Sequence, residues 1–168
     1  MTHIEVTEKG QTIAYSFDDM MKYHGPGSPG GVAQAFKVME RGFPVLSPDG
    51  PPSRREVAIR TSFGGPGARD GFEAVTRAFT GDRYTVAPAL ARPQLGRERE
   101  RFVFELSCGE RTVTLVVRDG IIDPEFIDLV RTEGRTEEQK ERLEVLKAER
   151  AERTMGTAAA DAYDIDEG

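Results

Sequence analysis

His24 is one of two histidines in this chain of 168 residues, and it stands at the front of a loop rich in glycine and proline. Imidazole changes its charge near neutral pH, so His24 is a candidate catalytic base or acid and a candidate metal ligand. Asp70 and Glu73 are three residues apart, which places both carboxylates on one face of a helix. With His24 they would form a catalytic set or hold a single divalent metal ion. A purely structural interpretation stays open, because acidic residues at a helix start stabilise the helix and a histidine can simply pack beside a tight loop.

Two loops of glycine and proline, at residues 24–31 and 63–70, each lead into a predicted helix. Glycine reaches backbone angles that other residues avoid and proline fixes φ, so such loops let a ligand approach the backbone closely. Free N–H groups at the start of the following helix favour an anion. We therefore predict a cleft between the loops that binds a small molecule or a metal ion. The candidate contacts to a small-molecule substrate are Tyr23, Gly27, Ser28, Gly65 and Arg69.

Two of these candidates have competing interpretations. Ser28 follows His24 by four residues, which is a spacing that a nucleophilic pair could use. The prolines around it do not match the strand-turn-helix of a nucleophile elbow, so we favour a hydroxyl that binds backbone or caps the next helix. Arg69 would either bind an anionic substrate or lie on the surface.

The composition limits the classes of partner. With 23 basic and 29 acidic residues the net charge is −6, which argues against general nucleic-acid binding. Arg97, Arg99 and Arg101 alternate with glutamates, which indicates a solvated surface loop. No stretch is long and apolar enough to span a membrane, and the first residues lack the features of a signal peptide. The single cysteine, Cys108, forms neither an internal disulfide nor a multi-cysteine zinc site, so we expect a cytoplasmic protein.

Periodicity predicts an α+β fold, in which a small, mainly antiparallel sheet has helices packed on one face. The clearest helix covers 31–42, with an apolar stripe from Val32 to Met39 and an expected end at Gly42. The clearest hairpin joins the alternating residues of 102–106 to those of 113–117. A further helix is predicted at 69–80, with Phe79 facing inward. The other predicted elements are a hairpin or an edge strand within 1–16, helices at 18–23, 124–130 and 136–153, and strands at 56–62 and 84–86.

The helix at 136–153 has Thr136 as its expected cap, and roughly half of its residues are charged. A helix this polar buries little of itself within its own domain. We therefore expect it to contact a second copy of the chain, most simply in a homodimer, or to stand in water. We assign residues 1–153 to a single domain and residues 154–168 to a flexible acidic tail.

The segment from Phe17 to Met39 resembles the N-terminal region of the FmdE-like family, which is named after a component of formylmethanofuran dehydrogenase. That family has a signature close to His-Gly-His-x-Cys-Pro-Gly, which in this chain reads His24-Gly25-Pro26-Gly27-Ser28-Pro29-Gly30. A later family segment of the type Cys-Gly-Val-Asp-Ala-Ile-Gln corresponds to residues 67–73. The similarity extends over roughly residues 15–150 and implies the family's α+β fold.

Departures from the family pattern change the chemistry that the resemblance implies. Pro26, Ser28 and Gly67 stand where the family has its second histidine and two cysteines, so a thiolate-based zinc site is lost. His24 and Asp70 remain, and they are compatible with a lyase or hydrolase that uses histidine as a base or metal ligand. The alternative is a non-catalytic interaction or accessory protein that has lost the family's metal site.

Overall fold

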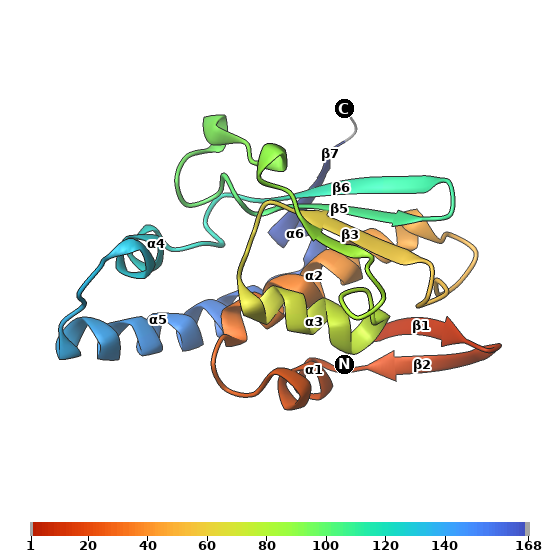
Figure 1. Cartoon of the computed structure of the whole chain (residues 1–168), viewed down its shortest axis with the longest axis horizontal. Coiled ribbons are helices and arrows are strands. Elements are labelled where there is room, and N and C mark those ends of the chain that lie inside the picture. The colour runs from red at the N-terminus through yellow and green to blue at the C-terminus, as the bar shows by residue number, and fades with distance from the viewer. Residues whose placement is uncertain (1, 167–168) are drawn as a thin grey trace.

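The computed structural model describes residues 2–166, and its architecture is α+β, as the sequence predicts. A five-stranded sheet lies over a layer of helices, and a separate two-stranded hairpin stands beside them (Figure 1). The strands are β1 Ile4–Glu8, β2 Gln11–Tyr15, β3 Val57–Thr61, β4 Tyr84–Val86, β5 Val103–Cys108, β6 Arg111–Val117 and β7 Tyr163–Asp166. The helices are α1 Phe17–His24, α2 Pro29–Leu46, α3 Pro66–Thr76, α4 Pro124–Arg131, α5 Glu137–Met155 and α6 Ala159–Ala162, with short 3-10 helices η1 Pro88–Leu90 and η2 Pro93–Leu95.

The main sheet has the strand order β4-β3-β5-β6-β7 and is antiparallel except where β3 pairs with β4. The predicted central hairpin forms β5 and β6, in a register that pairs Phe104 with Leu115. Both side chains are buried, as is Leu106, because alternate residues of a strand point to the same face. Gly109 makes the turn at a φ of 61°, in the left-handed region that glycine enters freely.

Helix α2 runs beneath the main sheet and packs against its strands and against α3 and α5 (Figure 1). The residues of the predicted apolar stripe, Val32 to Met39, are buried, but so are Gln34 and Lys37, so this part of the helix is covered on all sides and not along one face alone. The helix is longer than predicted, and Gly42 does not end it. A Cβ on Gly42 would lie only 2.8 Å from Cδ1 of Leu106, so this glycine lets the helix approach the sheet closely.

Helix α3 ends at Thr76, four residues earlier than predicted. Arg77 follows in the left-handed conformation, with a φ of 59°, and turns the chain away from the helix axis. The predicted inward position of Phe79 is therefore wrong. Its side chain is 53% exposed and lies at the surface, where its ring meets that of Tyr84 edge-on.

Helix α5 forms where the sequence predicts it, with Thr136 and Gln139 in a reciprocal capping box at its start. It does not stand free. Leu143 and Leu146 are buried, and the helix packs along α2 of the same chain. Apart from the buried Arg150, the charged residues occupy the other faces, so a helix with few apolar residues still contributes one continuous stripe to the core.

The predicted flexible tail over 154–168 is wrong for the part that the structure describes, 154–166. Helix α6 turns the chain back, and β7 pairs antiparallel with β6 at the edge of the main sheet. Tyr163 is fully buried, and its hydroxyl donates a hydrogen bond to Oε1 of Gln34 at 2.6 Å. The paired backbone and this anchored ring hold the segment despite its acidic residues, whereas residues 167–168 lie outside the described range.

Candidate functional site

The two glycine/proline loops meet in the structure, at the N-terminal ends of α2 and α3. A Cβ on Gly31 would lie 2.9 Å from the backbone nitrogen of Ala68, and a Cβ on Gly67 would lie 2.4 Å from the carbonyl oxygen of Ser28. Side chains at either position would force the two helix starts apart. Glycine is therefore required at this contact for its small size.

His24 joins the two loops through both of its ring nitrogens. The backbone N–H of Ser28 donates to Nε2 at 3.1 Å, so the ring proton of the neutral imidazole lies on Nδ1. Nδ1 in turn donates to Oδ2 of Asp70 at 2.7 Å. The imidazole is buried, with a side-chain exposure of 7%. In this arrangement His24 holds the loops together. Its unprotonated nitrogen, Nε2, already accepts a hydrogen bond from Ser28.

The carboxylate of Asp70 is held by a second donor from its own helix. Nε of Arg69 donates to Oδ1 of Asp70 at 3.0 Å, and the guanidinium also lies over the ring of Phe79. Burial by itself would raise the pKa of Asp70, but the hydrogen bonds from His24 and Arg69 and their charges outweigh it and hold that pKa below its ordinary value. Arg69 is thus a partner of Asp70 at the surface of α3.

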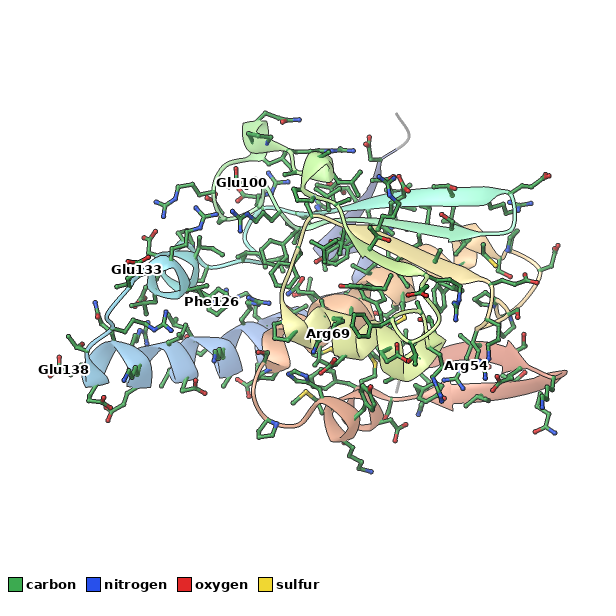
Figure 2. The ribbon with its side chains drawn as sticks, viewed as in Figure 1. Arg54, Arg69, Glu100, Phe126, Glu133 and Glu138 are labelled. Atoms are coloured by element: carbon green, nitrogen blue, oxygen red, sulfur yellow. The ribbon has the colours of Figure 1, made fainter. Side chains whose placement is uncertain are left out.

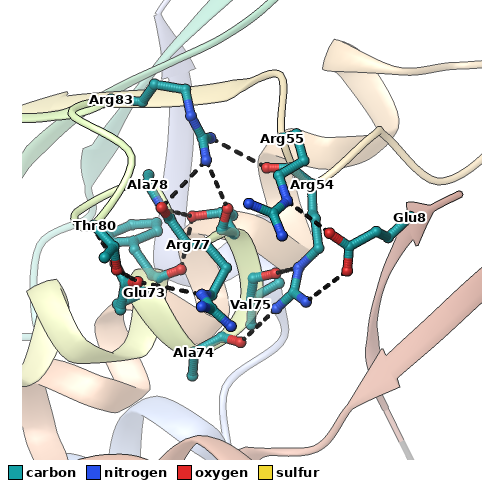
Figure 3. A network of polar contacts seen from close by, with 12 residues as sticks. Glu8, Arg54, Arg55, Glu73, Ala74, Val75, Arg77, Ala78, Thr80 and Arg83 are labelled. Atoms are coloured by element: carbon teal, nitrogen blue, oxygen red, sulfur yellow. Dashed lines mark hydrogen bonds and ion pairs between the residues drawn. The ribbon is translucent and has the colours of Figure 1, made fainter.

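Glu73 does not join His24, contrary to its predicted place in the catalytic set. Its carboxylate accepts hydrogen bonds from the backbone N–H of Thr80, at 2.9 Å, and from the Thr80 hydroxyl, with Arg77 3.7 Å away. Figure 3 shows these contacts within a polar network around the C-terminal end of α3. Glu73 lies one turn of α3 beyond Asp70, nearer the C-terminal end of the helix. The chain turns back after that end and brings the donors of Thr80 to the carboxylate.

The donor set around His24 does not fit a divalent metal ion. Nε2 faces an N–H group, and in the described part of the chain the only carboxylate bonded to the imidazole is that of Asp70. Throughout residues 2–166, no cluster of three or more His, Cys, Asp and Glu residues has a geometry that could hold a metal ion. The predicted metal-ligand role of His24 therefore has no support from its surroundings.

A cleft of about 500 Å³ opens beside the junction of the two loops, and we call it the loop cleft. One side is loop backbone, and the other sides come from the segment around residue 100, α4 and α5. Among residues 2–166, no acidic residue lines it. Of the predicted contact residues, Ser28 and Gly65 line it, whereas Tyr23, Gly27 and Arg69 do not. The basic lining residues are Arg97, Arg101, Arg131, Arg135, Lys147 and Arg150, and the larger apolar ones are Phe63, Phe102, Phe126, Ile127, Val130 and Leu143.

Arg150 is the most unusual of these residues, because it is only 2% exposed. Its guanidinium lies 4.5 Å from the ring centroid of Phe126 and 5.5 Å from that of Phe102. Figure 2 shows Phe126 in the space between α4 and α5. Nε of Arg150 is buried and has no hydrogen-bond partner among residues 2–166. Burial lowers the pKa of Arg150 to about 10, so the side chain is still charged at neutral pH.

The other basic residues of the loop cleft are held less firmly. Arg97, Arg131 and Lys147 each have a carboxylate partner, namely Asp128 at 2.6 Å, Glu100 at 3.2 Å and Glu144 at 3.0 Å. These pairs are partly or largely exposed and therefore weak. Arg135 donates to backbone carbonyls near the end of α4. Within residues 2–166, neither Arg101 nor Arg135 has a carboxylate partner.

The alternation of Arg97, Arg99 and Arg101 with glutamates predicts a solvated surface loop, but the structure gives these arginines further contacts. Arg97 and Arg101 line the loop cleft, and Arg99 donates to the carbonyl of Val117 at 2.9 Å, which ties the segment to the sheet. Arg150 is absent from the residues that the sequence singles out. Helical spacing could have pointed to it, because Arg150 falls on the same helical stripe as the buried residues Leu143 and Leu146.

No protein-family model matches the chain, and no curated protein is significantly similar to it. The likeness to the FmdE-like family therefore stays a prediction from the two motifs. Among residues 2–166, no helix combines the length and apolar character needed to cross a membrane.

Proposed function

We propose that this protein binds a small organic anion in the loop cleft. The observation that carries the proposal is the buried, charged side chain of Arg150, which has no carboxylate partner in the described part of the chain and whose Nε has no hydrogen-bond partner there. Burying a charge without a counter-ion costs on the order of several kcal/mol. An anion that enters the cleft beside the guanidinium would offset that cost.

The electrostatic surroundings support an anionic ligand. The N-termini of α2 and α3 carry partial positive charge and lie together on the loop side of the cleft. Arg101 and Arg135 add positive charge without carboxylate partners among residues 2–166. The chain as a whole has a net charge of −6, so this positive region is local. A local positive cleft in an acidic protein favours a specific small anion over general attraction to polyanions.

The size and lining of the loop cleft support an organic ligand. A volume of about 500 Å³ lies within the range of pockets that hold small molecules, roughly 300–1,000 Å³. Phenylalanine and aliphatic side chains form much of the wall opposite the loops. Such a wall favours an anion that also carries an apolar group, because the apolar group would displace water from it.

The contacts of His24 favour binding over catalysis. For His24 to act as a general base, Nε2 would have to release the N–H of Ser28, and the junction of the two loops would lose a hydrogen bond. Ser28 lines the loop cleft, but its contact with the imidazole is through the backbone N–H, and no hydrogen bond among residues 2–166 joins its hydroxyl to that ring. We therefore propose a binding role without assigning a catalytic step, and the lyase or hydrolase prediction ranks second.

The homodimer and the cytoplasmic location remain proposals from the sequence. Because α5 buries Leu143 and Leu146 against its own chain, it has little apolar surface left for a second copy. Sedimentation equilibrium measures the mass directly, and a species of 18.5 kDa at all concentrations would exclude the dimer.

The decisive variant for ligand binding is Arg150→Met, which keeps a long apolar side chain and removes the charge. We expect isothermal titration calorimetry to show loss of affinity for the organic anions phenyl phosphate and benzoate by about tenfold or more. Urea denaturation of the ligand-free variant should give an equal or higher free energy of unfolding, because an unpaired buried charge has been removed.

Arg153→Met is the matched control, because Arg153 is an exposed arginine of the same helix. Arg153→Met should leave the affinities for phenyl phosphate and benzoate unchanged. If neither anion binds the wild-type protein, or if Arg150→Met retains full affinity, the proposal is wrong.

A further inference from the structure

We infer that the ligand of the loop cleft is a phosphate monoester with an aromatic group. Its phosphate would lie at the paired helix N-termini beside Arg150, and its aromatic group would lie against Phe63. This inference rests on the proposed function and names the chemical class of the ligand.

The loop side of the cleft is formed by the first turns of α2 and α3, where the two helix N-termini meet. Gly30 and Gly31 stand in the first turn of α2 and Gly67 in that of α3, and these helices are 18 and 11 residues long. These glycines are buried, and the space that a Cβ would fill holds Arg150 or the backbone of the facing loop, so the positive ends of both helices lie close together beside the guanidinium. Arg150 is the second, independent feature. Its buried guanidinium lies beside Gly30 and lines the same cleft.

The charges around the cleft favour phosphate over carboxylate. Of the six basic lining residues, three have carboxylate partners and three, Arg101, Arg135 and Arg150, do not within residues 2–166. A carboxylate brings one negative charge, whereas a phosphate monoester brings about −1.5 to −2 at pH 7. Its three terminal oxygens also point in different directions, which suits donors that come from two helices and a side chain.

The aromatic side chains of the cleft favour a ligand with an aromatic group. The rings of Phe63 and Phe102 stack with centroids 4.5 Å apart and an interplanar angle of 26°, and the guanidinium of Arg150 lies against Phe102. Phe102 is nearly buried, but Phe63 is only partly buried and lines the cleft. A planar group packed on Phe63 would extend this stack. Inorganic phosphate alone would leave these side chains in contact with water.

Calorimetric titration of the full-length protein with three probes tests the inference. Phenyl phosphate has both features, benzoate replaces the phosphate with a carboxylate, and inorganic phosphate lacks the ring. We expect phenyl phosphate to bind about tenfold more tightly than either of the others. Benzoate binding as tightly as phenyl phosphate would overturn the phosphate assignment but leave the organic-anion proposal standing. Inorganic phosphate binding as tightly would overturn the aromatic assignment. Binding of none of the three would overturn both the inference and the proposed function.

A variant of Phe63 tests where the aromatic group binds, and the pH dependence of the affinity tests the role of the phosphate. Phe63→Leu should weaken the binding of phenyl phosphate by about fivefold or more and leave the binding of inorganic phosphate unchanged. The control is Phe79→Leu, at an exposed phenylalanine outside the cleft, which should change the affinity for neither probe. The affinity for phenyl phosphate should rise between about pH 5 and pH 7, as the second phosphate ionisation near pH 6 is completed. Equal losses for both probes in Phe63→Leu, or a flat pH dependence, would contradict the assignment.

Discussion

A Cβ on Gly30 would lie 2.6 Å from Nε of Arg150, so the missing side chain at Gly30 is what gives the buried guanidinium its space. One residue opens α2 and the other lies in the second half of α5. Because α5 packs along α2, the charged end of Arg150 lies beside the first turn of α2. The loop cleft therefore depends on a contact between two elements that are far apart in the chain.

Substitution of Gly30 by alanine tests this contact. The new methyl group would displace the guanidinium, so we expect about tenfold weaker binding of phenyl phosphate by calorimetry. Alanine is favoured over glycine within a helix by about 1 kcal/mol, so a net loss of stability in urea denaturation would reveal the steric conflict. Gly27→Ala is the control, because its Cβ would meet only Nε2 of His24, at 4.0 Å. Unchanged affinity in Gly30→Ala would show that the position of Arg150 is irrelevant to binding.

Asp70→Asn tests the hydrogen bond between His24 and Asp70 through its pH dependence. The pKa of Asp70 is lowered in the folded protein, so its ionised form contributes stability above its unfolded pKa of about 3.9. That contribution is lost as the pH falls through the folded pKa. We expect the wild-type protein to be more stable than the variant by about 1–3 kcal/mol at pH 7 and the difference to shrink below about pH 4.

Urea denaturation over this pH range measures the effect, with Asp82→Asn as the control because Asp82 is exposed. A difference between wild type and Asp70→Asn that stays constant with pH would refute the electrostatic account of this contact.

Glu73→Gln separates stability from function. The amide keeps the shape of the side chain but weakens its bonds to Thr80 and its ion pair with Arg77, so we expect the free energy of unfolding to fall by about 1–3 kcal/mol. The affinity for phenyl phosphate should not change. Glu110→Gln, at an exposed turn, is the control for loss of charge alone. Loss of ligand binding without loss of stability would restore a functional role for Glu73.

Tyr163→Phe tests the anchoring of β7. Its hydroxyl donates to Oε1 of Gln34, whose Nε2 donates to Thr154 at 2.9 Å, so removal of the hydroxyl leaves a buried acceptor unpaired. We expect a loss of about 1–3 kcal/mol in urea denaturation and faster hydrogen exchange of the β7 amides. Tyr23→Phe is the control, since Tyr23 is 58% exposed. Equal stability of the two variants would mean that β7 is held by backbone pairing alone.

Local patterns predict most of the secondary structure, because they involve residues within one or two turns of each other. The apolar stripe of α2 and the Thr136 capping box of α5 are examples. Prediction fails where a distant partner decides the outcome. Gly42 has the chemistry of a helix end but packs on Leu106, and Tyr163 lies in an acidic segment but forms an edge strand on β6.

In the candidate site, too, some features follow from local sequence and others depend on distant partners. Glycine and proline act through their own backbone, so the sequence by itself determined that residues 24–31 and 63–70 would be bare segments leading into helices. It also supplied His24 and Asp70, but as a proposed reactive pair. Only the tertiary structure decided that this pair holds the loops together and that Arg150 lies beside them. The physical reason is that a buried charge is recognisable only once the helices that surround it are packed.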